Sequence, residues 1–241
     1  MPSKEEAEPV ETSKDGNHLI DSLPSRQRQA VLAQCERVEL AAGAVICEAG
    51  KPFQYAYFPI GGTISLVSSI TGYKPFETES IGSEGMVGAT LVLDINSSPQ
   101  GGIVQTPCLA LRVSAGSLQA AMRKEPALSP ILQRYLHFAL TEILQTAGCV
   151  RFHDVRMRLA RALLLAHDRA QTDQLPLTHL LLAGMLGVQR GAVTIAAAKL
   201  QRAGVIRYTR GKIAILDRPA LEAASCGCYE ASLENRASNL S

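Results

Sequence analysis

The sequence predicts a mixed α+β chain, in which a strand-rich N-terminal domain, one long helix and a helical C-terminal domain follow one another. Three observations predict this order. Short runs of Val, Ile, Tyr and Phe alternate with glycines between about 38 and 114, as in antiparallel sandwiches and barrels. Apolar residues then recur every three or four positions between 126 and 149, which is typical of a helix. Two further helical runs and a hairpin-like segment follow before residue 224.

The composition is that of a folded chain outside the membrane. Hydrophobic residues make up 46% of the 241 residues, and no apolar run approaches the ~20 residues that a membrane span requires. Residues 1–17 are polar and acidic and contain no apolar signal core. We therefore expect a disordered tail over 1–17, a cytoplasmic location and no membrane partner.

The net charge of +2 conceals an uneven distribution. From residue 150 onward the chain has 13 Arg and Lys against 7 Asp and Glu, a balance of +6, whereas the preceding residues have a balance of −4. A basic half beside an acidic half indicates that the C-terminal half meets a polyanion.

Residues 18–125 are predicted to form an antiparallel β-barrel domain of the jelly-roll or cupin type, with a short helix that Pro24 opens near its start. Its clearest strand patterns are 55–58, 63–67 and 109–113. Because such short strands recur at roughly ten-residue spacing with glycines at the turns, this domain is predicted to be an antiparallel sandwich or barrel.

The next segment, 126–149, reads as one helix with two apolar faces. One face would pack on the β-domain. The other would pack on a second copy of the chain in a parallel coiled-coil homodimer, or be buried within a monomer. The residues predicted to make the dimer contact are Leu132, Tyr135, Leu136, Ala139 and Ile143.

Residues 178–203 carry the pattern of a helix-turn-helix within a C-terminal domain over 150–224. Thr178 is a suitable N-cap, Ala183 is small enough for a close helix contact, and Gly187 suits the left-handed turn. The positions that must face inward are apolar, namely Leu182, Leu186, Val188, Val193 and Ala196.

The outward face of the second helix is predicted to meet double-stranded DNA in the major groove. Arg190 would bind guanine in a bidentate manner, and Gln189 would read adenine. Lys199 and Arg202 would contact phosphates. The full set of predicted DNA-binding residues is Gln189, Arg190, Gly191, Thr194, Lys199, Arg202, Thr178, Arg210 and Lys212.

Residues 205–216 read as a β-hairpin whose two-residue turn is Arg210-Gly211. A hairpin that directly follows a recognition helix is a wing. Arg207, Arg210 and Lys212 would place cations beside the DNA backbone and contribute salt-dependent affinity.

This layout resembles the Crp–Fnr superfamily of bacterial transcription regulators over residues 18–224. The resemblance rests on Tyr57-Phe58 followed by Gly61-Gly62-Thr63, on Gly85-Met-Val-Gly88, on the run from Leu182 to Arg190, and on the wing. It implies that the barrel over 18–125 is sensor-like and that the chain acts as a homodimer on a pseudo-palindromic promoter site, with RNA polymerase as a further partner. The geometry by which the helix docks on DNA is taken from that superfamily.

The chain departs from the cyclic-nucleotide-binding members at the expected effector pocket, Gly88, Ala89, Gln100 and Gly101. Those members have a Glu where this chain has Ala89, and Arg-Ser where it has Gln100-Gly101. A buried phosphate without a cationic partner is costly, so cAMP is not expected. The alternatives are a receptor for another small molecule in the barrel, or a regulator controlled by its own level or by cysteine oxidation.

The recognition helix departs from the superfamily as well. Gly191 stands where many relatives have Glu, and Ile195 where they have a second Arg. The operator of the better-known members is therefore not expected to apply.

No cofactor, metal site or enzyme activity is predicted. The cysteines contain neither a CxxC pair nor the N-terminal cluster that iron–sulfur relatives use. The close pair Cys226-Gly227-Cys228 lacks a partner pair at zinc-finger spacing and is assigned to a plain C-terminal tail, 225–241. None of the five histidines has the context of a haem ligand, and no catalytic constellation stands out.

Overall fold

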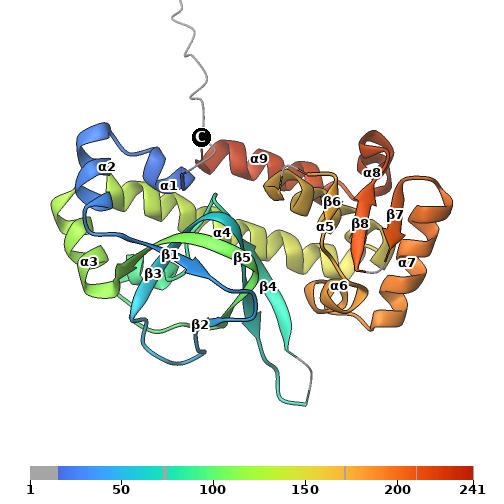
Figure 1. Cartoon of the computed structure of the whole chain (residues 1–241), viewed down its shortest axis with the longest axis horizontal. Helices are drawn as coiled ribbons and strands as arrows, with labels where there is room; N and C mark the ends of the chain where they lie inside the picture. The colour runs from blue at the N-terminus through green and yellow to red at the C-terminus, as the bar shows by residue number, and fades with distance from the viewer. Residues whose placement is uncertain (1–15, 73–74, 171, 210, 241) are drawn as a thin grey trace, which may run out of the picture.

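The computed structural model describes residues 16–72, 75–170, 172–209 and 211–240 (Figure 1). The disordered tail predicted for 1–17 lies almost entirely outside these residues. Gly16 and Asn17 are the exceptions, and Asn17 is fully buried, caps the first helix and donates hydrogen bonds to Pro59 O and Gly85 O at 2.9 and 2.8 Å. The ordered chain therefore begins before residue 18.

The N-terminal domain is an antiparallel sheet in the strand order β1-β5-β3-β4, with β2 paired to β5. The sheet is jelly-roll-like, but it does not close into the predicted barrel. It folds over itself because β3 and β5 are each 14 residues long and are bent by irregular pairing between Pro59 and Ile64. Its strands are β1 Glu36–Leu40, β2 Val45–Cys47, β3 Tyr55–Ser68, β4 Phe76–Ile81 and β5 Gly101–Ser114.

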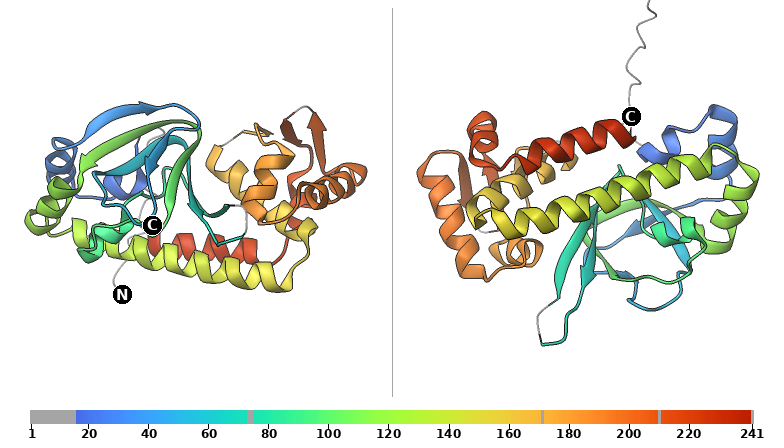
Figure 2. Two further views of the ribbon diagram at one scale, coloured as in Figure 1. Left: turned by 90° about the horizontal axis from the view of Figure 1, so that it is seen from below. Right: turned by 180° about the vertical axis from the view of Figure 1, so that it is seen from behind.

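Helices cover the ends and one side of this sheet (Figures 1 and 2). The long helix α4 runs past the sheet and on to the C-terminal domain, and Leu132 and Tyr135 pack into the sheet's core beside Phe58. The helices of this part are α1 His18–Asp21, α2 Ser25–Leu32, the 3-10 turn η1 Ala89–Leu93, α3 Ala115–Lys124 and α4 Leu128–Phe152.

The long helix is confirmed, but three of its predicted dimer contacts are corrected. Leu132, Tyr135 and Ala139 are 0%, 1% and 7% exposed, because they pack against their own chain. Leu136 is half-buried and Ile143 is exposed. The face open to a partner is therefore turned around the helix from the predicted one.

The C-terminal domain is a helix-turn-helix with a three-stranded sheet of order β6-β8-β7. Leu159, Leu163, Leu182 and Val193 lie at the centre of its core. Its elements are α5 Val155–Ala170, β6 Gln174–Leu175, α6 His179–Leu186, α7 Arg190–Arg202, β7 Ile206–Thr209, β8 Lys212–Ile215 and α8 Arg218–Ala224. Within the described residues no single helix is long and apolar enough to cross a membrane, and only α6 and α7 taken together, bent by 108°, have sufficient length and apolar composition.

A further helix, α9 (Cys228–Leu240), occupies the segment predicted as a tail, 225–241. It lies alongside α4 and returns toward the N-terminal domain (Figure 2). Asn235 Nδ2 donates to Phe138 O at 3.2 Å and to Glu142 Oε1 at 2.8 Å, and Leu240 packs on the core of the sheet domain. The tail prediction is wrong because α9 is held against α4 by contacts between residues 93 and 97 positions apart, which the local sequence does not reveal.

Candidate nucleic-acid interface and interdomain cavity

The helix-turn-helix has the local geometry that its sequence predicts. Thr178 Oγ1 accepts a hydrogen bond from Leu181 N at 3.1 Å and so caps α6. Gly187 ends α6 at φ +60°, in the left-handed region that glycine adopts at little cost. Ala183 is buried where α6 meets α7, and the two helices bend by 108°. This bend leaves one side of α7 facing outward.

The exposed side of α7 and the wing is cationic. Gln189, Arg190 and Gly191 are all exposed at the start of α7. Lys199 and Arg202 are exposed two and three turns further along. From 174 to 216 the sequence contains six Arg and Lys and no Asp or Glu, so no acidic residue of this segment offsets them. Such a surface attracts a polyanion, and its leading end has the donors that read base edges.

Thr194 is exposed, as predicted, but its hydroxyl already has partners. It donates to Arg190 O at 3.1 Å and lies 3.0 Å from His179 Nδ1. The ring of His179 in turn stacks on Tyr208 of the wing, with centroids 4.0 Å apart. This chain of contacts links α6, α7 and the wing, so Thr194 positions the recognition helix whether or not it meets a base.

The structure adds His179 to this interface, a residue that the sequence did not single out among its five histidines. It is 8% exposed. Burial, followed by the nearby charge of Arg190, lowers the pKa of His179. His179 directly follows the N-cap residue Thr178, and nothing in this local sequence indicates that its ring contacts α7 and the wing.

The wing is a two-residue hairpin, since Thr209 pairs with Lys212 and Gly211 has φ +84°. Gln201 Oε1 accepts a hydrogen bond from Tyr208 N at 2.8 Å and joins the wing to α7. Arg207 and Lys212 are exposed beside α7. Arg210, the remaining predicted cation, lies outside the described residues.

Comparison with known families agrees with this architecture. A model of the cyclic nucleotide-binding domain matches residues 37–125, and a model of the Crp-like helix-turn-helix domain matches residues 157–224. The chain belongs to the Crp–Fnr superfamily. It is therefore a DNA-binding transcription regulator, and the predicted resemblance is confirmed.

Solved structures of Crp–Fnr regulators share the fold. FixK2 of Bradyrhizobium japonicum is 14% identical over 80% of this chain and 98% of its own, with a TM-score of 0.68. A CRP-family transcriptional regulator of Thermus thermophilus, TTHB099, is 17% identical over 78% and 96%, with a TM-score of 0.66. The c-di-GMP-responsive regulator CLP of Xanthomonas campestris is 20% identical over 80% and 99%, with a TM-score of 0.64. Among curated proteins no match was found.

The four residues of the predicted effector pocket are all uncharged. Gly88, at φ +98°, turns the chain into η1, and Ala89 is half-buried against the sheet's core. The side-chain amide of Gln100 donates to Thr78 Oγ1 at 2.7 Å, and Gly101 pairs with Val67 at the start of β5. Gln100 is thus engaged within the sheet, and none of the four residues supplies a cation.

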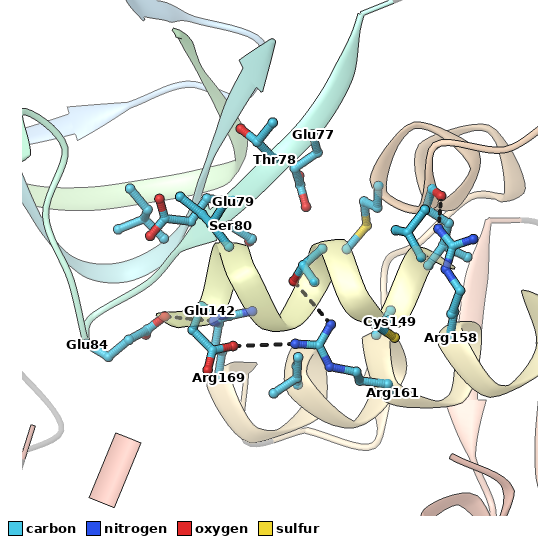
Figure 3. Close-up of a pocket in the computed structure, with 18 of the residues that line it drawn as sticks. Glu77, Thr78, Glu79, Ser80, Glu84, Glu142, Cys149, Arg158, Arg161 and Arg169 are labelled. Carbon is cyan, nitrogen blue, oxygen red and sulfur yellow. Dashed lines mark hydrogen bonds and ion pairs between the residues drawn. The ribbon is translucent and has the colours of Figure 1, made fainter. Parts of the chain in front are cut away.

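A charged cavity of about 130 Å³ lies instead between the two domains of this Crp–Fnr regulator (Figure 3). Carboxylates of β4 line one side, and arginines of α5 line the other. Arg169 Nε donates to Glu84 Oε1 at 2.8 Å, and Arg161 Nη2 lies 3.4 Å from Glu142 Oε2. These ion pairs join the C-terminal domain to the sheet and to α4.

The pKa values of two carboxylates in this cavity are shifted in opposite directions. Burial raises the pKa of Glu79 to about 7, against the weaker opposing charge of Arg169. Burial would also raise the pKa of Glu84, but the charges of Arg169 and Arg236 outweigh it and lower that pKa. Glu79 therefore holds its proton more tightly than an ordinary glutamate does, whereas Glu84 holds its proton less tightly.

Another arginine of α5, Arg158, contacts the first helix of the helix-turn-helix. It is buried and donates a hydrogen bond to Leu186 O, the last residue of α6. A cation at a helix C-terminus is favourable because the carbonyl ends carry partial negative charge. Arg158 therefore fixes the orientation of α6 relative to α5.

Proposed function

We propose that this regulator acts as a homodimer that places α7 of each copy in successive major grooves of a pseudo-palindromic promoter site. The cationic, acid-free surface from 174 to 216 is the observation that carries the proposal. Arg190 would bind guanine, Gln189 would read adenine, and Lys199, Arg202 and Lys212 would contact phosphates. RNA polymerase would be a further partner at such a promoter.

An apolar stripe on α4 supports the dimer. Leu140 and Leu144 are 56% and 64% exposed, and Ile143 is 41% exposed. With Leu136 and Ala147 they recur at intervals of three and four, which is the pattern of a coiled-coil seam. We name the set Leu136, Leu140, Ile143, Leu144 and Ala147 the α4 seam.

DNA binding is tested by fluorescence anisotropy on an operator obtained by mapping bound chromatin. Arg190→Ala should reduce discrimination between operator and scrambled DNA by about 10- to 100-fold, because a bidentate guanine contact contributes about 1–3 kcal/mol. Arg26→Ala, an exposed arginine of α2, is the matched control and should leave binding unchanged. Unaltered discrimination by Arg190→Ala would refute the assignment of α7 as the recognition helix.

The dimer is tested by sedimentation. Replacing Leu140 and Leu144 together by Glu should shift the chain from dimer to monomer and weaken operator binding. Leu93→Glu with Ile95→Glu is the matched control, since these two residues, at the end of η1 and just after it, are 59% and 50% exposed. A dimer that survives the seam change would place the interface elsewhere.

The protein is proposed to act without cAMP, because Ala89 and Gln100 offer neither the acceptor nor the cation that the nucleotide needs. The alternative is a receptor for a different small molecule, which the interdomain cavity favours. At about 130 Å³ this cavity is below the ~300–1,000 Å³ of ordinary ligand pockets, so it suits a small charged ligand better than a nucleotide. Calorimetry with cyclic nucleotides tests the first statement, because saturable micromolar binding would contradict it.

A further inference from the structure

Four potential metal ligands from distant parts of the chain meet where α4 ends. Cys149 and His153 are one helical turn apart at the end of α4, whereas Cys226 lies between α8 and α9 and Cys228 is the first residue of α9. We name Cys149, His153, Cys226 and Cys228 the thiol cluster. Its three cysteines are free, 3%, 3% and 6% exposed, and form a small packed group of their own with Met157.

The distances within the thiol cluster are those of one tetrahedral metal ion. The Sγ atoms of Cys149 and Cys226 are 3.6 Å apart, and Cys228 Sγ is 3.5 Å from His153 Nδ1. All four ligand atoms lie within 4.8 Å of one another. In a zinc site, with Zn–S near 2.3 Å and Zn–N near 2.0–2.1 Å, neighbouring ligands are about 3.5–3.8 Å apart. The cluster therefore needs little movement to surround an ion.

The donor set selects the ion. Three sulfurs and one imidazole nitrogen form the Cys₃His set of structural zinc sites, and soft thiolates disfavour magnesium and calcium. The compact spacing leaves room for a single ion, not for a cluster of several irons. The cluster supplies four protein ligands, so the site would be closed, as structural zinc sites are.

The surrounding charge fits the same ion. Binding one Zn²⁺ releases three thiol protons to solvent and leaves three thiolates around a divalent cation, a net charge of −1. Arg158 and Arg161 of α5 are both buried beside the cluster, and their charges act on its cysteines. A buried anionic metal centre thus has cationic neighbours already in place.

A disulfide explains less of this arrangement. Cys149 and Cys226 would have to move from 3.6 Å to the ~2.05 Å of a bond, and the bond would use two of the three thiols. A disulfide would then leave unexplained why Cys228 and His153 lie close together beside it. A metal ion accounts for all four residues at once.

We propose that the thiol cluster binds one Zn²⁺ and joins the end of α4 to the segment between α8 and α9. The domain between these two attachments is the helix-turn-helix and wing. The ion would therefore fix the angle at which the DNA-binding domain leaves α4. The sequence alone predicts no metal site here, because 76 residues separate Cys149 from Cys226. Only the fold brings Cys149 and His153 close to Cys226 and Cys228.

The experiment measures zinc in the full chain, purified anaerobically without a polyhistidine tag. Elemental analysis should find about one zinc per chain. Cys226→Ser with Cys228→Ser should retain less than about 0.1, while Cys35→Ser with Cys47→Ser, a matched pair of half-buried cysteines, should retain the wild-type amount. Cobalt(II) added to the metal-free chain should give sulfur-to-cobalt charge-transfer bands and tetrahedral d–d bands. His153→Ala should alter the d–d bands while circular dichroism shows the fold intact.

Three results would overturn the proposal. One is a wild-type chain that neither contains zinc nor gives the cobalt bands after stoichiometric addition. Another is equal zinc in the wild type and the Cys226/Cys228 variant. The third is a Cys149–Cys226 disulfide found by mass spectrometry in the anaerobic protein.

The consequence for DNA rests on the proposed function, and the metal count does not. Removing zinc should weaken operator binding about tenfold without changing the preferred sequence, because α7 is intact but less well positioned. Loss of zinc with unchanged DNA affinity would refute the coupling alone.

Discussion

Two groups of cations in the C-terminal domain have opposite surroundings. The arginines of α5 that line the interdomain cavity are largely buried, and each has a partner: Arg158 has Leu186 O, Arg161 has Glu142 and Ser232, and Arg169 has Glu84. The cations of α7 and the wing are exposed in a segment without any carboxylate. Both groups contribute to the basic balance of this half, yet only the second is available to DNA.

This difference shows that the number of arginines and lysines in a domain does not tell how many of them are free to bind DNA. An arginine whose guanidinium is already bonded inside the protein holds domains together, and removing it leaves a buried acid without compensation. An arginine on an acid-free surface costs the fold little when it is removed, because its partner is another molecule. Changing one member of each group tests this division.

The largest effect should come from Arg169→Ala. It leaves Glu84, whose side chain is 5% exposed, without its ion-pair partner and should lower the free energy of unfolding by about 3 kcal/mol. Denaturant titration measures the change. Adding Glu84→Gln should recover part of the loss, whereas Arg190→Ala should leave stability within about 0.5 kcal/mol. Equal stabilities for Arg169→Ala and Arg190→Ala would contradict the claim that the buried arginines stabilise the fold and the exposed ones do not.

Next in size is a pH effect at Glu79. Its pKa is raised to about 7 in the folded chain from 4.5, so the folded state holds the proton more tightly and this contribution to stability declines as pH rises from about 5 through 7. Glu79→Gln should therefore stabilise the chain by about 2 kcal/mol at pH 8 and leave it unchanged at pH 5. Unfolding curves at the two pH values measure this. Glu39→Gln, at an exposed position on β1, should show no such pH-dependent gain.

A smaller effect is expected from Thr194→Val. This change tests whether a residue on the exposed side of α7 can act mainly through hydrogen bonds within the protein, as the arginines of α5 do. Losing the hydrogen bonds to His179 and Arg190 O should cost about 1 kcal/mol of stability. Discrimination between operator and scrambled DNA should change less than about twofold. A loss comparable to that of Arg190→Ala would make Thr194 a base-reading residue instead. Thr209→Val, on the exposed wing, is the control.

The smallest effect should come from Lys212→Ala. It should reduce the slope of log affinity against log salt by about 0.9 and weaken operator and scrambled DNA alike, because a phosphate contact carries no sequence information. Anisotropy titrations over a range of salt concentrations measure the slope. A selective loss on the operator would show that the wing reads bases.

Local signals in the sequence were sufficient for the parts that depend on short-range chemistry. The Thr178 cap, the Gly187 turn, the wing register and the length of α4 were all predicted because each follows from neighbouring residues. The open sheet, the buried ring of His179 and the position of α9 depend on contacts across dozens of residues. The α4 seam, which we propose as the dimer contact, lies between these cases: the sequence shows the periodicity of α4, but the exposed face is known only once Leu132 and Tyr135 are seen to be buried in the sheet's core.

The return of α9 along α4 changes how the DNA-binding domain can move. Arg236 in the last turns of α9 lies 3.4 Å from His18 at the start of α1, so the described ends of the chain lie beside each other. The DNA-binding domain is therefore attached to the rest of the chain at two places, through the end of α4 and through the start of α9, and not through a single hinge. A rotation at 153–154 must also shear α9 against α4, which ties the angle of the recognition helix to the register between these two helices.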